Sequence, residues 1–147
     1  MSVRSTCLLG ALALAIASCG SSSTPVAASC KVDRGELPAW ATTGFSDPHP
    51  KMPHVVGAAG RIAAILFADP LRATDGRDGP QNKILWVARD PQQAMSDLTI
   101  RAVHGDDTLE RTVPGGPGPS VVDLPKGCWT LELSWSGRTD RLNLQYD

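Results

Sequence analysis

The stretch that decides the fold is Gly127–Trp135, which reads GCWTLELSW. Its large apolar residues occupy every second position, with small or polar residues between them. Because successive side chains of a β-strand point to opposite faces, this alternation predicts a strand with one buried face made of tryptophans and leucines. The tight-turn pair Ser136-Gly137 follows, and apolar residues then alternate with polar ones up to Tyr146. The C-terminal residues are therefore predicted to form a β-hairpin.

Upstream segments predict five further strands, separated by turns rich in Gly, Pro and Asp. They are residues 60–67, 83–89, 97–104, 108–113 and 121–124. The first two are apolar on both faces and are expected in the centre of a sheet, whereas the third and fourth alternate. About seven short strands without a convincing amphipathic helix predict an all-β fold, a β-sandwich.

The N-terminus carries a targeting pattern. A single positive charge precedes an apolar run over residues 7–17, which is too short to span about 30 Å of hydrocarbon. Two small residues then precede Cys19. This order resembles the lipobox of bacterial lipoproteins, whose cysteine accepts a diacylglyceryl group before cleavage. We therefore predict a lipoprotein signal peptide over 1–18, a lipidated Cys19 with a flexible Ser-rich tether over 19–29, and a folded domain over 30–147.

The lipobox resemblance implies a location on the extracytoplasmic face of the cell membrane, held there by the acyl chains on Cys19. The alternatives are an ordinary secretory signal cleaved near Ala28, or a buried helix. In an oxidising compartment, Cys30 and Cys128 are expected to form a disulfide, the alternatives being a reactive thiol or metal ligation. Residues 31–53 are rich in turn formers and lack a period, so we expect an extended N-terminal segment tethered by this disulfide.

Residues 124–131 resemble the entry to the penultimate strand of immunoglobulin-like domains, where a turn containing Gly leads into an aromatic residue and alternating apolar ones. The resemblance implies an immunoglobulin-like β-sandwich. Because Cys30 lies far upstream of the first body strand, the expected disulfide is not the usual link between the two sheets. The lipobox, the tether and the Gly-Cys-Trp near the end are together similar to small uncharacterised lipoproteins of high-GC Gram-positive bacteria, a resemblance that implies no particular activity.

The net charge and the motifs limit the classes of function that this chain can have. A net charge of −1 without a stripe of clustered Lys or Arg argues against nucleic acid as a partner. The nucleophile-elbow, zinc-protease and dinucleotide motifs do not occur in the sequence, so we expect that the protein is not an enzyme. Hydrolysis in the cell envelope is the least favoured of the functions considered. We predict a binding or scaffolding module whose partner is an envelope protein or glycan, recognised through the loops over 69–80 and 114–119.

Residues 49–54, with the sequence HPKMPH, favour an alternative function in metal handling. Imidazole and thioether ligands suit copper, and Met selects Cu(I), so His49, Met52 and His54 are candidate ligands, with Met95 and His104 completing the site. The segment is faintly similar to His/Met copper chaperones of the bacterial envelope, without their ligand spacing. The competing interpretation is a rigid proline-rich connector with exposed histidines and Met52 packed against the body.

The four tryptophans are the other candidate contact residues, because exposed indoles stack on sugars or on apolar partner surfaces. Trp86, Trp129 and Trp135 lie in strands whose pattern predicts burial, so we expect them in the core. Trp40 lies in the irregular N-terminal segment and is the one we predict as a contact residue.

Overall fold

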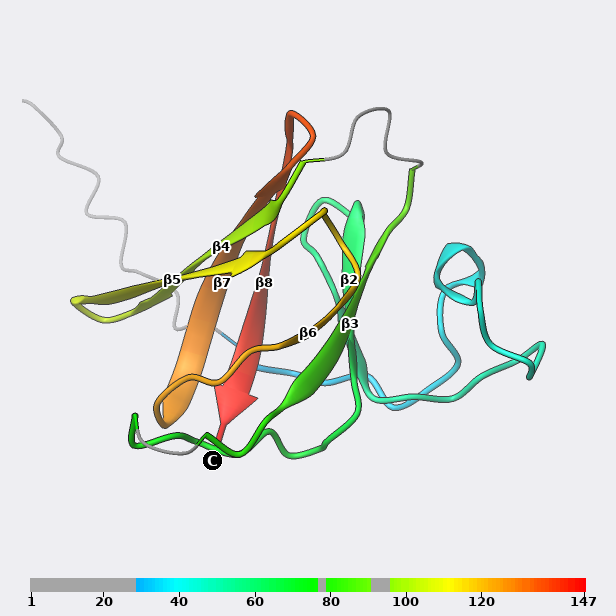
Figure 1. Cartoon of the computed structure of the whole chain (residues 1–147). Helices are drawn as coiled ribbons and strands as arrows, with labels where there is room; N and C mark the ends of the chain where they lie inside the picture. Colours follow the sequence, from blue (N-terminus) through cyan, green and yellow to red (C-terminus); the bar gives the residue numbers. More distant parts are fainter. Residues whose placement is uncertain (1–28, 77–78, 91–95) are drawn as a thin grey trace, which may run out of the picture.

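Eight β-strands form two antiparallel sheets that pack face to face (Figure 1). The computed structural model describes residues 29–76, 79–90 and 96–147. The first sheet has the order β1-β2-β3-β6, with β1 at His54–Val56, β2 at Ile62–Leu66, β3 at Lys83–Ala88 and β6 at Pro119–Val121. The second has the order β5-β4-β7-β8, with β5 at Asp107–Val113, β4 at Leu98–His104, β7 at Gly127–Trp135 and β8 at Arg138–Tyr146. The predicted all-β sandwich is confirmed.

The predicted strands correspond closely to the observed ones, with two differences. The strand predicted over 121–124 begins earlier, at Pro119, and ends at Val121. The short strand β1 was not predicted, because three residues are too few to show an alternation. In the second sheet, β7 lies between β4 and β8 and is the penultimate strand of the chain; the immunoglobulin-like resemblance stays a prediction.

The core lies between the two sheets and contains three of the tryptophans. Trp86, Trp129 and Trp135 are at most 2% exposed, so their predicted burial is confirmed. The indole N–H of Trp129 donates to the carbonyl oxygen of Pro125 at 2.8 Å, which closes the turn that leads into β7. The buried aromatic residue at the start of β7 thus satisfies its polar atom on the backbone just upstream.

An N-terminal arm over residues 33–54, which includes the 3-10 helix η1 (Ala39–Ala41), lies on the outer side of the first sheet (Figure 1, cyan). Its two limbs pair as a hairpin, through bridges between Asp33 and His54 and between Glu36 and Lys51. Ala63 and Ile65 of β2 are fully buried but do not belong to the core between the sheets. We infer that the arm covers them, which explains why β2 is apolar on both faces.

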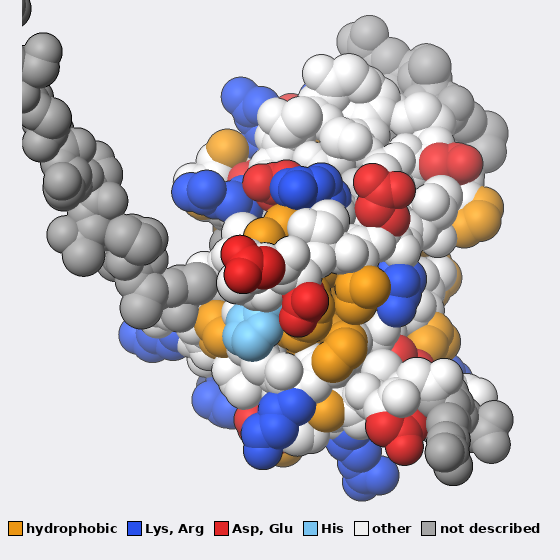
Figure 2. Space-filling model, turned by 90° about the vertical axis from the view of Figure 1, so that its left-hand side faces the viewer, with side chains coloured by type: hydrophobic (Ala, Val, Ile, Leu, Met, Phe, Trp, Pro, Cys, Tyr) orange, Lys and Arg blue, Asp and Glu red, His pale blue; other side chains and the backbone are white. Residues whose placement is uncertain are grey.

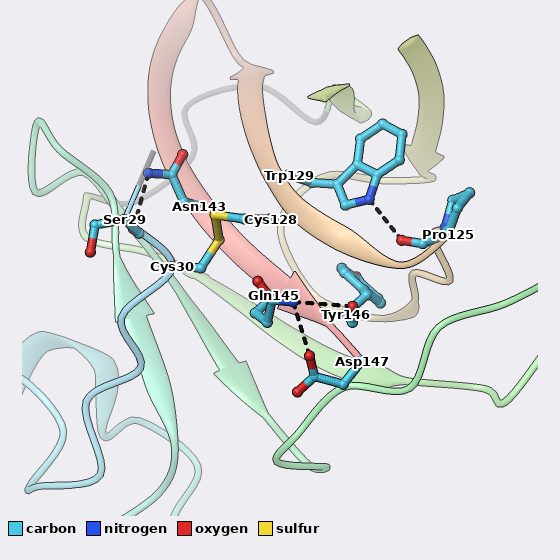
Figure 3. Close-up of a disulfide and its surroundings, with 9 residues drawn as sticks. All are labelled: Ser29, Cys30, Pro125, Cys128, Trp129, Asn143, Gln145, Tyr146 and Asp147. Atoms are coloured by element: carbon cyan, nitrogen blue, oxygen red, sulfur yellow. Dashed lines mark hydrogen bonds between the residues drawn. A yellow bond between two sulfur atoms is a disulfide. The ribbon is translucent and has the colours of Figure 1, made fainter. Parts of the chain in front are cut away.

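The disulfide between Cys30 and Cys128 is present, with Cα atoms 5.8 Å apart and a sequence separation of 98 (Figure 3). Cys128 lies on the outward face of β7, opposite Gln145 of β8. Beside it, the amide of Asn143 donates to the carbonyl oxygen of Ser29 at 3.2 Å. The start of the described chain is therefore fastened to the outer face of the second sheet, and the predicted tethering of the N-terminal segment is confirmed.

Candidate functional site

Four exposed charged side chains cross the outer face of the second sheet in a single row, here named the charged row. In the strand order β5-β4-β7-β8 they are Glu110, Arg101, Glu132 and Arg141. Each lies directly opposite its neighbour in the register, so the sign of the charge alternates at every step. Figure 2 shows this face, where blue and red side chains alternate in a band across its upper part.

The rows on either side of the charged row carry no formal charge. One row consists of Thr112, Thr99, Ser134 and Thr139, and the other of Thr108, Val103, Thr130 and Asn143. Hydroxyl and β-branched side chains suit a pleated surface that faces water, whereas the opposite face of the same strands supplies the core. Within these three rows, the outer face is therefore polar, with all its formal charge in one line.

The middle and the ends of the charged row differ electrostatically. Nη1 of Arg101 lies 2.8 Å from Oε2 of Glu132, and their side chains are 47% and 50% exposed. An ion pair this exposed contributes at most about 1 kcal/mol to stability. Within the described residues, the side chains of Glu110 and Arg141 make no ion pair and no side-chain hydrogen bond. The row thus ends in two unpaired charges of opposite sign.

A hollow of about 690 Å³ lies over this face. Its lining includes the whole charged row, Arg61 and residues Ala58 and Ala59 of the β1–β2 turn. No residue of the charged row was predicted as a site residue from the sequence. The alternation in each strand shows that these side chains face outward, but only the pairing of the strands brings them into one line.

The rim of the hollow beyond β8 is held by Asp140, which is 8% exposed. Its Oδ1 accepts the backbone N–H of Ala59 at 2.8 Å and its Oδ2 accepts that of Arg61 at 2.8 Å. The N–H of Ala58 also donates to the carbonyl oxygen of Arg141 at 2.8 Å. The turn from the first sheet is therefore fastened to the edge strand of the second.

The described part of the loop over 69–80, predicted as part of a recognition surface, is fastened to the body of the domain by hydrogen bonds of Arg72, Ala73 and Thr74. The buried amide of Asn82 donates to Oδ1 of Asp123 at 2.7 Å and to the carbonyl oxygen of Arg72 at 2.8 Å. Nearby, the hydroxyl of Tyr146 donates to the carbonyl oxygen of Val122 at 2.9 Å. Burial raises the pKa of Tyr146, and the charge of Asp123 adds to the rise. These groups serve the fold, and recognition by the loops remains a prediction.

The candidate copper ligands lie in different surroundings. His49 is exposed, with Nδ1 2.7 Å from Oε1 of Glu36, and this hydrogen bond raises the pKa of His49. His54 is 3% exposed in β1, with Nδ1 2.8 Å from the carbonyl oxygen of Met52. The expectation of two exposed loop histidines is thus correct for His49 and wrong for His54, because His54 begins β1, where it pairs with Asp33 and its side chain is buried.

Two further residues were named as completing a copper site. Met95 lies outside the described residues, and the ring of His104 lies 5.3 Å from that of Trp129, centroid to centroid. In the part of the chain that the structure describes, no three His, Cys, Asp or Glu side chains gather as metal ligands. Copper binding stays a prediction.

Trp40 is half-buried at η1 of the arm. It lines a shallow hollow together with Val87 and Arg89, on the outer side of β3. The indole therefore lies against the sheet, and its role as a contact residue stays a prediction.

The predicted lipid-bearing Cys19 lies outside the described residues, as does the predicted signal peptide. Among the residues that are described, no helix has the length and apolar character needed to cross a membrane.

No family model, curated protein or solved structure was found to match this chain.

Proposed function

We propose that the chain is a non-enzymatic binding module, held on the extracytoplasmic face of the cell membrane by a lipid on Cys19. The observation that carries the proposal is the contrast between the two outer faces. The arm lies on the outer side of the first sheet (Figure 1), whereas the second sheet exposes the charged row over a broad hollow. A flat face on a rigid sandwich holds its side chains in fixed positions, which favours recognition of a partner.

The chemistry of the face supports binding of a polar partner. An exposed guanidinium presents several donors in a planar fork that matches carboxylates, and an exposed carboxylate accepts from donors on a partner. The flanking hydroxyls donate and accept as well. An envelope protein or a glycan with groups of both signs or many hydroxyls fits this surface.

The distance to the membrane supports the proposed anchor. Ten residues lie between Cys19 and Cys30, so a fully extended tether spans at most about 40 Å. Because the disulfide fixes Cys30 on the outer face of β7, the same side of the domain carries both the attachment point and the charged row. The proposed binding face would therefore work within reach of the bilayer surface.

The anchor is tested with Cys19→Ser, with Cys7→Ser as the matched control because Cys7 falls in the predicted signal peptide. In cells that make each variant, the wild type and Cys7→Ser are expected in the membrane fraction as a chain that begins at Cys19. Cys19→Ser is expected as a heavier precursor that keeps residues 1–18, because acylation precedes cleavage. Mass spectrometry of the N-terminal peptide should show a diacylglyceryl group on Cys19. An unmodified Cys19 in a protein that still sediments with membranes would refute the anchor.

The binding face is tested by photo-crosslinking on intact cells. A photoreactive residue in place of the exposed Ser134 on the outer face of β7 should give crosslinked products. The same residue in place of Thr43, which is exposed on the arm, is the control and should give few. Equal products from both positions, or products from Thr43 alone, would show that the face is not where partners bind.

A further inference from the structure

We propose that the partner of this face is a second copy of the same chain, related to the first by a two-fold axis parallel to the strands. The inference rests on the proposed function, because it names the occupant of the same face. It is carried by the order of charges in the charged row, which is complementary to itself.

The complementarity follows from the strand order. A two-fold axis that runs along the strands between β4 and β7 places β5 over β8 of the second copy and β4 over its β7. Glu110 then faces Arg141 of the second copy, and Arg101 faces its Glu132. Symmetry repeats both contacts, so all four steps of the row meet the opposite sign. This holds because the sign alternates over an even number of strands; a row that read the same in both directions would meet like charges.

The pairing also satisfies the two charges of the row that have no partner among the described residues of the single chain. Glu110 and Arg141 lie at opposite ends of the row, and each would face the other across the interface. The existing pair of Arg101 and Glu132 would join its symmetry mate in a cluster of four charges. A partner of uniform charge would leave half of the row facing its own sign, which costs free energy and so disfavours such partners.

The shape of the face permits the contact. The described chain, which begins at Ser29, is fastened to Asn143 and Cys128 at one end of this face. The contact therefore uses the charged row and the flanking row of Thr112, Thr99, Ser134 and Thr139, where no like charges meet. The strands of packed sheets cross at about 30°. With strands about 4.8 Å apart, this angle displaces each end of the row by about 4 Å from the facing end of the other copy, a distance that an arginine side chain can span. The rim formed by Ala58 and Ala59 stands beyond β8, so the edge strand β5 of the second copy would be seated in the hollow.

The size of the face predicts weak association. Four strands by about seven residues cover about 19 Å by 24 Å, or roughly 450 Å² a side, which is an upper bound because Ser29 and Cys30 occupy one end of the face. The total is below the 1,200 Å² or so of stable interfaces, so the pair belongs to the transient class. Confinement to a membrane raises the effective concentration of such partners, and exposed charge pairs make the contact sensitive to salt.

The test uses the predicted mature chain, residues 19–147, with Cys19→Ser, so that neither the lipid nor the apolar run over 7–17 contributes to association. Sedimentation equilibrium at low salt, from roughly 10 μM to 1 mM, covers the affinities expected of a transient pair. The wild-type face should dimerise. Glu110→Arg alone and Arg141→Glu alone should each weaken dimerisation about tenfold or more, because each puts like charges at two symmetric contacts.

The decisive measurement is an equimolar mixture of the two single variants. In the mixed pair every contact is again between opposite charges, so association should return to the wild-type level. If the row acts only within one chain, the mixture will associate no better than either variant alone, and the inference is overturned. A wild type that stays monomeric over the whole range overturns it too.

A double variant separates dimerisation from folding. In Glu110→Arg/Arg141→Glu, like charges become neighbours within the sheet, so thermal stability should fall slightly, while the contacts between copies are all restored. Circular dichroism checks that each variant is folded. If the wild type is monomeric but still crosslinks to another molecule from position 134, the dimer is refuted and the binding module is retained. If the wild type neither dimerises nor crosslinks from position 134, both proposals are refuted.

Discussion

Replacing Gly57 with alanine should destabilise the protein through a single carboxylate. The carboxylate of Asp140 accepts three backbone N–H groups, from Ala59, Arg61 and Arg141, each at 2.8 Å. An added Cβ on Gly57 would have atoms of this carboxylate as its three nearest neighbours, with Oδ1 at 2.7 Å. Gly57 does not have a positive φ, so steric overlap with Asp140 is the main reason for glycine here.

The magnitudes follow from these contacts. Overpacking of this kind costs about 2 kcal/mol, so Gly57→Ala should lower the free energy of unfolding by that amount. Asp140→Ala removes three hydrogen bonds to a charged acceptor, and because the freed amides regain some water, we expect a loss of about 3 kcal/mol. In the double variant the overlap is gone, so alanine at 57 should cost nothing and the total loss should stay at about 3 kcal/mol.

The assay is urea unfolding followed by tryptophan fluorescence, with the disulfide intact, on the wild type, both single variants and the double variant. Gly118→Ala is the matched control, because an added Cβ there meets nothing nearer than 3.9 Å. It should change stability by less than about 0.5 kcal/mol. If the losses of the two single variants simply add in the double variant, within about 0.5 kcal/mol, the steric explanation is refuted.

Three further predictions concern the N-terminal part. Replacing Cys30 and Cys128 together with serine should cost about 4 kcal/mol in the same unfolding assay, since the disulfide closes a loop of 98 residues; a loss below about 1 kcal/mol would contradict this. The hydrogen bond from Glu36 raises the pKa of His49 above 6.5, so the pairing stabilises the fold at acidic pH and is lost as the pH rises through the raised pKa. NMR titration should show this pKa return toward 6.5 in Glu36→Gln. Trp40→Ala should cost about 1–2 kcal/mol because the indole is half-buried, and an unchanged stability would mark the indole as available for contacts.

The strands of the second sheet could be predicted well because each of them carries its own signal. The alternation in Gly127–Trp135 fixes which face is buried, and the pair Ser136-Gly137 fixes the turn that follows. In that turn φ is 44° at Ser136 and 71° at Gly137, as a two-residue hairpin of type I′ requires. Local chemistry thus determines both the strand and its connection.

The arm and the charged row could not be predicted, because each depends on residues far apart in the sequence. The arm is held by pairs such as Asp33 with His54, in a segment without any period. The buried state of His54 follows from that pairing and from β1, and nothing in its immediate neighbours reveals it. The charged row requires the register of three strand pairs, which alternation within one strand does not specify.

The place of the disulfide determines how the molecule bears mechanical load. Tension on the N-terminal segment passes from Cys30 to Cys128 through covalent bonds and enters the domain at β7, an inner strand of its sheet. The arm and the whole first sheet lie between the two cysteines in sequence, so a pull from that end cannot unravel them while the bond is intact. Reduction of one bond would therefore expose to stretching a part of the chain that is otherwise shielded from it.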